Sequence, residues 1–198
     1  MPYVPVHRMQ LGRGTPVPGR TRGALDCGPR SWQVGIDART RGTAFYPVSF
    51  LRARGRVPGP QPTNIDDAKR AIDGLRVQRR TPLRYFRRRT VAGVRKAVRR
   101  GFPVQLAISY RKWNTIVKHD SGDPAFRGGH SILIADQRDR GHGVEWLIYD
   151  SLEDGRRKNI PRGPSWRRRR DVVAAAVALA DGDRNRIWAG VIAGAKKP

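Results

Sequence analysis

The stretch TVAGVRKAVRRGFPVQLAISY, residues 90–110, carries the clearest local pattern in the chain. Thr90 stands where a helix N-cap is expected, and four apolar residues follow it at helical spacing: Val91, Val94, Ala97 and Val98. Gly101 then ends the helix directly after two arginines, whose charges suit a helix C-terminus. Residues 102–110 alternate like a strand. This stretch therefore predicts a helix, a glycine turn and a strand in succession.

Downstream of this unit, the sequence predicts a sheet with one more helix. HSILIADQ (130–137) and VEWLIYD (144–150) are apolar runs rich in strand-forming residues, and the turn-like RDRGHG separates them. That arrangement favours an antiparallel hairpin. The alanine-rich residues 167–181 predict a helix, and residues 186–193 a final strand.

Upstream, the sequence predicts two helices. Asp26 can cap a helix over 26–39, which places Cys27 at its start, and Asn64 with acids in the first turn predicts a helix over 65–76. Residues 43–62 mix a short apolar run with a Pro/Gly-rich loop and give no assignment. Helices come first, followed by a mostly antiparallel sheet with one late helix, so we expect an α+β fold.

The length of 198 residues predicts one domain with additional terminal segments. Residues 1–24 carry four prolines and four glycines without apolar periodicity, which is typical of an extended basic arm. We expect the domain to span residues 25–195, with a basic tail at 196–198. An arm of this kind usually mediates assembly, contacts a polyanion or stays disordered.

The net charge of +25 at pH 7 favours an anionic partner. The basic residues gather in two arginine runs, at residues 76–100 and 167–170. Tyr85 and Phe86 lie within the first run. Arginines for phosphates and aromatic rings for stacking are what a nonspecific nucleic-acid surface needs, although a solvated face or an arginine-rich genome gives the same pattern. The candidate polyanion-binding residues are Arg79, Arg80, Arg84, Arg87, Arg88, Arg89, Arg167, Arg168, Arg169 and Arg170.

Several classes of protein are disfavoured by what the sequence lacks. No apolar run approaches the roughly 18 residues of a membrane span, and residues 1–11 lack the apolar region of a signal peptide. Cys27 is the only cysteine, so neither a disulfide framework nor a cysteine-based zinc site is expected. Scattered histidines and the lack of a Gly-rich phosphate loop predict no metal and no cofactor.

Cys27, His130 and Asp150 are the candidate catalytic residues. A helix N-terminus and a neighbouring imidazolium both stabilise a thiolate, and Cys27 has the first of these by local sequence. His130 begins one strand of the predicted hairpin and Asp150 ends the other, so Asp150 could orient a His130 that acts on Cys27. Asp136 and Asp120 are alternative partners, and His142 is an alternative base that lacks the strand pattern.

Four segments resemble the papain-like cysteine peptidases, in the order that this family has them. DCGPRSWQ (26–33) is similar to the nucleophile helix, GFPVQLAISY (101–110) to the strand that follows a helix and a glycine, GGHSILIADQ (128–137) to the histidine strand and WLIYDSL (146–152) to the aspartate strand. The branch of bacteriocin-processing-like peptidases is the most similar. Cell-wall amidases share the chemistry but usually bring the histidine sooner than 103 residues after the cysteine.

The resemblance implies a papain-like fold, with a helical half packed on an antiparallel sheet and the site in the cleft between them. It implies that Cys27 is the nucleophile, His130 the base and acid, and Asp150 the orienting residue. In one respect the chain departs from the family. A glutamine about six residues before the cysteine normally completes the oxyanion hole, whereas Gln10 is the only upstream glutamine here.

Two functions follow as expectations. The first is a thiol hydrolase that cleaves peptide or isopeptide bonds of a protein or peptide substrate. The second is a catalytically weak or inactive structural protein that binds a protein partner or nucleic acid. The combination also resembles papain-like proteins of tailed phages of GC-rich bacteria, which implies a virion protein, in the virion or host cytoplasm, that contacts other virion subunits through residues 1–24.

Overall fold

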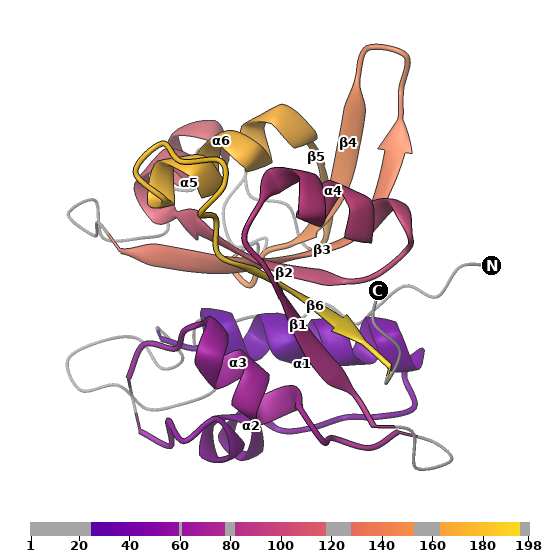
Figure 1. The fold of residues 1–198 in the computed structure, drawn as a ribbon, viewed down its shortest axis with the longest axis vertical. Coiled ribbons are helices and arrows are strands. Elements are labelled where there is room, and N and C mark those ends of the chain that lie inside the picture. The colour runs from indigo at the N-terminus through magenta and orange to yellow at the C-terminus, as the bar shows by residue number, and fades with distance from the viewer. Residues whose placement is uncertain (1–24, 60, 78–81, 118–127, 153–162, 195–198) are drawn as a thin grey trace.

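The computed structural model of the chain describes residues 25–59, 61–77, 82–117, 128–152 and 163–194. In these ranges, six helices and one antiparallel sheet of six strands form a mixed α+β fold, which confirms the predicted class. Figure 1 shows α1, α2 and α3 below the sheet and α4, α5 and α6 above it. The predicted arm, residues 1–24, and the tail, residues 196–198, lie outside the described residues.

The helices form two groups along the chain. Three precede the first strand: α1 (Cys27–Thr40), α2 (Val48–Arg54) and α3 (Ile65–Ile72). Three lie between or after strands: α4 (Val91–Arg99), α5 (Tyr110–Val117) and α6 (Arg169–Leu179). No helix among the described residues is long and apolar enough to cross a membrane.

The sheet has the strand order β1-β6-β2-β3-β4-β5, so the last strand of the chain lies in its interior. Its strands are β1 (Arg84–Arg88), β2 (Val104–Ser109), β3 (Gly129–Asp139), β4 (Val144–Tyr149), β5 (Ser165–Arg168) and β6 (Ala189–Ala193). All neighbours are antiparallel, and Ile108 of β2 lies opposite His130 of β3. β3 and β4 form the predicted hairpin.

Each face of the sheet packs against one group of helices, because successive strand residues point to opposite faces. Leu106, Ile108, Ile132 and Ile134 join the core made with α4, α5 and α6. Leu133 and Ile192 instead join the clusters made with α1, α2 and α3. Because helices cover both faces of the sheet, β2 and β6 are almost entirely buried, and their residues are apolar or glycine except for Gln105 and Ser109 of β2.

Most predicted elements are present, with shifted ends. α3 keeps its Asn64 cap but ends at Ile72 rather than at residue 76, because Asp73 turns extended and its carboxylate accepts the backbone N–H of Tyr85. Residues 165–168, which overlap the start of the helix predicted over 167–181, form β5 instead. The sequence did not predict α2, α5 or β1. β1 precedes α4 in the chain, and the last strand, β6, lies inside the sheet, so the chain does not complete its helices before it forms the sheet.

The predicted capping role of Asp26 is wrong: its side chain makes no cap hydrogen bond at the start of α1. Asp26 instead accepts a 2.7 Å hydrogen bond from Nε of Arg52 in α2, and both side chains are fully buried. Nη1 of Arg52 donates to the carbonyls of Gly59 and Gln61, and Nη2 donates to the carbonyl of Leu25. One guanidinium therefore ties the start of α1 to the loop before α3.

Replacing Arg52 with alanine should lower the free energy of unfolding by about 3–5 kcal/mol, because the Asp26 carboxylate would stay buried without the guanidinium that balances its charge. Arg52→Lys should also destabilise the protein, since an ammonium cannot reproduce the fork of the guanidinium. Arg54→Ala, an exposed position two residues along the same helix, is the control and should cost less than about 1 kcal/mol. Urea unfolding of the three variants would measure this, and equal losses for Arg52→Ala and Arg54→Ala would contradict it.

Candidate active site

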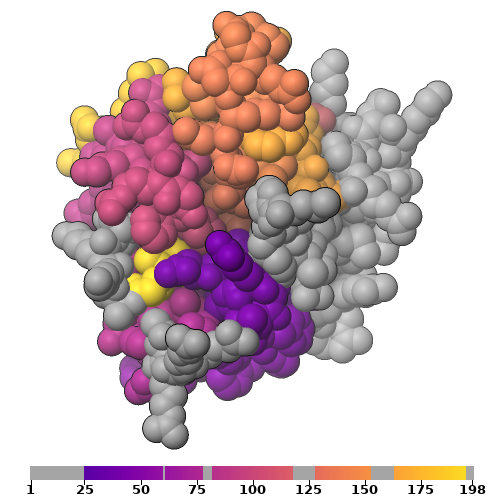
Figure 2. Space-filling view, turned by 90° about the vertical axis from the view of Figure 1, so that its right-hand side faces the viewer, coloured from indigo at the N-terminus to yellow at the C-terminus, as the bar shows by residue number. Residues whose placement is uncertain are grey.

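Cys27 is the first residue of α1, and this helix lies directly against the sheet. The approach is close at Gly35, where a Cβ atom would lie 2.4 Å from Cδ1 of Ile192. In Figure 2 the indigo residues of α1 lie beneath the orange β3–β4 segment. Cys27 therefore sits at a helix N-terminus, whose partial positive charge favours a thiolate.

A buried polar network fixes the first turn of α1 to the sheet. Oε1 of Gln105 in β2 accepts hydrogen bonds from Nε1 of Trp32 (3.1 Å) and from the hydroxyl of Tyr85 (2.6 Å). Its Nε2 donates to Oγ of Ser131 in β3 at 2.8 Å. The hydroxyl of Ser31 lies 2.8 Å from the carbonyl of Cys27 and 3.0 Å from that of Ser131, so it can donate to either.

His130 and Asp150 form a buried pair at the end of the β3–β4 hairpin. Nε2 of His130 lies 2.7 Å from Oδ1 of Asp150, and both side chains are buried. The carboxylate accepts two further hydrogen bonds, from the backbone N–H of Leu152 to Oδ1 (2.9 Å) and from Nε1 of Trp113 to Oδ2 (2.7 Å). Three donors around one carboxylate favour its charged form.

The thiol of Cys27 is hydrogen-bonded to the His130 side chain, so the three candidate residues form one chain. Since Nε2 faces Asp150, the nitrogen that remains for the sulfur is Nδ1. Burial would lower the pKa of His130, but the Asp150 carboxylate and the hydrogen bonds to Asp150 and Cys27 raise it from 6.5 to about 10. The imidazole is therefore held as imidazolium at neutral pH.

The same contacts lower the pKa of Cys27. Burial of the thiol raises its pKa, but the hydrogen bond and positive charge of His130 act in the opposite direction. The backbone amides of Ser131 and Gly28 also hydrogen-bond the sulfur, and these bonds lower the pKa of Cys27 further. The net pKa of Cys27 lies below that of an ordinary cysteine thiol, so the arrangement favours a thiolate–imidazolium pair.

An open groove of about 700 Å³ gives access to this pair. Cys27, which is half-buried, lines one part of it together with His130 and Ser131. Arginines and the indole of Trp188, which is 55% exposed, line other parts. The arginines are Arg87, Arg88, Arg89 and Arg186, and Arg87 is ion-paired with Asp66.

Thr63 is the polar side chain of this groove with an unused hydrogen-bonding group near Cys27. Its Oγ1 is buried and has no hydrogen-bond partner among the described residues. It lies against the first turn of α1, because a Cβ atom on Gly28 would lie 2.1 Å from it. A buried hydroxyl without a partner is costly and is a reason to suspect a functional role.

Cys27, His130 and Asp150 are brought together, whereas the alternatives lie elsewhere. Asp136 is exposed on β3 and its carboxylate accepts the backbone N–H of Gln137, and His142 is in the β3–β4 turn. Asp120, the oxyanion candidate Gln10, and Arg79 and Arg80 lie outside the described residues.

The described members of the two arginine runs do not form one surface. Arg87, Arg88 and Arg89 line the Cys27 groove, whereas Arg168, Arg169 and Arg170 line a different cavity. Arg84 is exposed on β1, and Nε of Arg167 donates to Oγ of Ser165. The two cavities have no lining residue in common.

Sequence reasoning missed Trp113, Gln105, Arg52 and Thr63. Trp113 lies in α5, which directly follows β2 and was not predicted from the sequence. Its indole donates to the carboxylate of Asp150, 37 residues later in the chain. Gln105 stands in a strand-like run where a buried apolar residue would be the ordinary choice. A polar residue in such a run signals a buried hydrogen-bond network, although not its partners.

No group of three or more His, Cys, Asp or Glu side chains within the described ranges is arranged to hold a metal ion. Comparison of the chain with protein-family models and with curated proteins finds no match in either. The site must therefore be interpreted from its own geometry.

Proposed function

We propose that the protein is a papain-like thiol hydrolase that cleaves peptide or isopeptide bonds through an acyl-enzyme at Cys27. The observation that carries the proposal is the hydrogen-bonded chain from Cys27 through His130 to Asp150, at the wall of an open groove. A nucleophile, a base and an orienting group in that order are what acyl transfer requires. The helical layer under the cysteine and the sheet under the histidine support the papain-like assignment.

In the acylation step, the Cys27 thiolate attacks the carbonyl carbon of the scissile bond and forms a carbon–sulfur bond. The electron pair of the carbonyl moves onto oxygen and returns as the carbon–nitrogen bond breaks. The imidazolium of His130 gives its Nδ1 proton to the leaving amine. The products of this step are a free amine, a thioester on Cys27 and a neutral His130.

In the deacylation step, neutral His130 takes a proton from water, and the hydroxide formed attacks the thioester carbon. The carbon–sulfur bond breaks, which releases a carboxylic acid and restores the thiolate–imidazolium pair. Asp150 stays ionised throughout, because its three hydrogen bonds hold the carboxylate charge. Its role is to fix the ring of His130 and to stabilise the imidazolium.

The tetrahedral intermediate needs hydrogen-bond donors for its oxyanion. The backbone N–H of Cys27, at the start of α1, is one candidate. The hydroxyl of Thr63 is the second, because it lies beside the first turn of α1 and has no other described partner. On this assignment Thr63 takes the oxyanion role for which Gln10 was the side-chain candidate from the sequence.

A second candidate function is a virion assembly protein that uses the same fold to bind partners without cleaving them. The observation that favours it is the number of arginines that line two separate cavities. Binding and cleavage differ in one respect that can be measured, since only cleavage requires an activated thiolate.

Alkylation of Cys27 by iodoacetamide between pH 4 and 9 tests the proposal directly. The wild-type protein should react rapidly well below pH 8, because the thiolate is stabilised by His130. His130→Ala should react at least about tenfold more slowly at pH 6, since each unit of thiol pKa changes the thiolate fraction about tenfold. Slow reaction in both proteins, with an ordinary thiol pKa near ~8.5, would reject the hydrolase and support the assembly protein.

Asp150→Asn should move the pH profile of this alkylation upward by about one unit or more. Removal of the carboxylate charge lowers the pKa of His130 and thereby raises that of Cys27, so less thiolate is present at pH 6. Asp136→Asn, on the exposed part of β3, is the matched control and should leave the profile unchanged. Equal profiles for the two variants, with both proteins folded by circular dichroism, would contradict the assigned role of Asp150.

Thr63→Val should slow acylation of Cys27 by p-nitrophenyl acetate by roughly 10²-fold, because attack on an ester generates an oxyanion. Alkylation by iodoacetamide generates no oxyanion and should keep its wild-type rate. Thr115→Val, which removes an exposed hydroxyl in α5, should change neither reaction. If Thr63→Val alters both reactions equally, or neither, Thr63 is not an oxyanion donor.

A further inference from the structure

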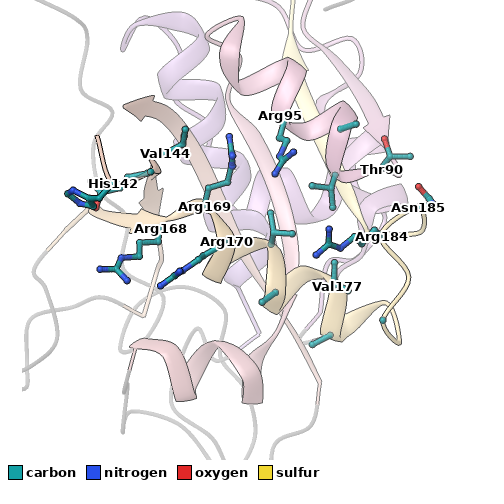
Figure 3. Close-up of a pocket in the computed structure, with 18 residues that line it drawn as sticks. Thr90, Arg95, His142, Val144, Arg168, Arg169, Arg170, Val177, Arg184 and Asn185 are labelled. Atoms are coloured by element: carbon teal, nitrogen blue, oxygen red, sulfur yellow. The ribbon is translucent and has the colours of Figure 1, made fainter. Parts of the chain in front are cut away.

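A second cavity, of about 1040 Å³, lies between α4, α6 and the turn and strands β4 and β5. Figure 3 shows that Arg95, Arg168, Arg169, Arg170 and Arg184 surround it. None of its lining residues belongs to the Cys27 groove, so the proposed hydrolysis makes no use of it.

The arginines of this cavity lack the partners that such residues normally find. Within the described ranges, the guanidinium groups of Arg95, Arg168, Arg169 and Arg184 make no ion pair, and the largely exposed Arg170 meets Asp171 at 3.6 Å. Among the described residues of the lining, Glu145 is the one acidic side chain, and its Oε2 already accepts a 2.8 Å hydrogen bond from Nε of Arg138. The cavity therefore has an excess of positive charge.

Neighbouring guanidinium groups repel one another at Arg169, which is half-buried. Burial and the charges of Arg95 and Arg99 lower its pKa, and the charge of Asp139 acts in the opposite direction. Like charges held close together destabilise a fold unless an anion joins them. The cavity is thus arranged to gain from a negatively charged occupant.

The floor of the cavity is apolar. Val91 and Val173 are buried there, Val144 and Val177 are half-buried, and Ala174 and Ala178 are exposed to the cavity. No Phe, Tyr or Trp lies among the described residues of its lining, and His142 is the one aromatic ring among them, so the cavity lacks the row of rings on which successive bases stack. A phosphate backbone would make no use of the valines and alanines either, so the lining favours a ligand with acidic and apolar groups together.

The charge of the chain argues against two other occupants of this cavity, a second copy of the chain and its own residues 1–24. A second copy would bring another net charge of +25, and residues 1–24 carry four arginines and no acidic residue. We propose that this cavity binds an acidic, amphipathic segment of a different protein, with apolar side chains on the valine and alanine floor and carboxylates against the arginines. Arg95, Arg169 and Arg184 are the central contacts for those carboxylates.

Fluorescence anisotropy with the full chain tests the proposal. The probe is a short fluorescein-labelled peptide whose leucines recur at helical spacing and whose other residues are mostly glutamate. Arg95→Gln with Arg169→Gln should weaken its binding about tenfold or more. The control pair Arg111→Gln with Arg140→Gln removes the same charge from exposed positions outside the cavity and should weaken binding much less.

The apolar floor is tested by Ala178→Glu, which places a carboxylate in the cavity at an exposed helical position. This variant should weaken binding about tenfold or more, whereas Thr115→Glu in α5 should have little effect. A peptide of the same composition with scrambled leucines should bind more weakly than the amphipathic peptide.

Three results would overturn the proposal. The first is equal binding by the Arg95/Arg169 variant and its control pair. The second is equal affinity for the amphipathic and scrambled peptides, which would indicate charge attraction alone. The third is a DNA duplex that displaces the peptide and loses affinity with the Arg95/Arg169 variant but not with Ala178→Glu, which would assign the cavity to a phosphate backbone.

Discussion

The buried pair of Asp26 and Arg52 is the constraint on which the rest of the site depends. Two charges removed from water cost several kcal/mol unless every polar group finds a partner, and here the guanidinium also reaches carbonyls of Leu25, Gly59 and Gln61. Those contacts fix the residue before Cys27 and the loop that leads to Thr63. The nucleophile and one wall of its groove are thereby held relative to each other by a single side chain.

The second half of the site is held independently, on the sheet. Asp150 is anchored by Trp113 and Leu152 as well as by His130, so its position does not depend on Cys27. The two halves meet through Gln105 and Ser131, which connect the first turns of α1 to the centre of the sheet. Preorganisation of this kind matters for acyl transfer, because small displacements of the reacting groups cost much of the rate.

The α+β class, the hairpin and the three candidate residues were accessible from the sequence because each depends on a local pattern. Thr90 and Asn64 cap their helices as predicted, and β3 and β4 pair as the predicted antiparallel hairpin. What could not be predicted depends on contacts distant in sequence. Asp26 looks like a cap, yet its carboxylate meets an arginine 26 residues away, and nothing local announces the indole of Trp113 beside Asp150. β1 was hidden in an arginine-rich run, because its partner β6 lies about a hundred residues later.

Arginine has different physical roles at different depths of this fold, which the net charge of +25 cannot distinguish. Arg52 is fully buried and satisfied by five acceptors, so its charge is part of the structure. Arg87 shares its charge with Asp66 at the groove. Arg95 and Arg169 make no ion pair with a carboxylate in the described part of the chain, and their positive charges repel each other. A guanidinium is available to a ligand only where the protein has not already neutralised it, so the unpaired arginines, rather than the longest basic runs, indicate where an anion would bind.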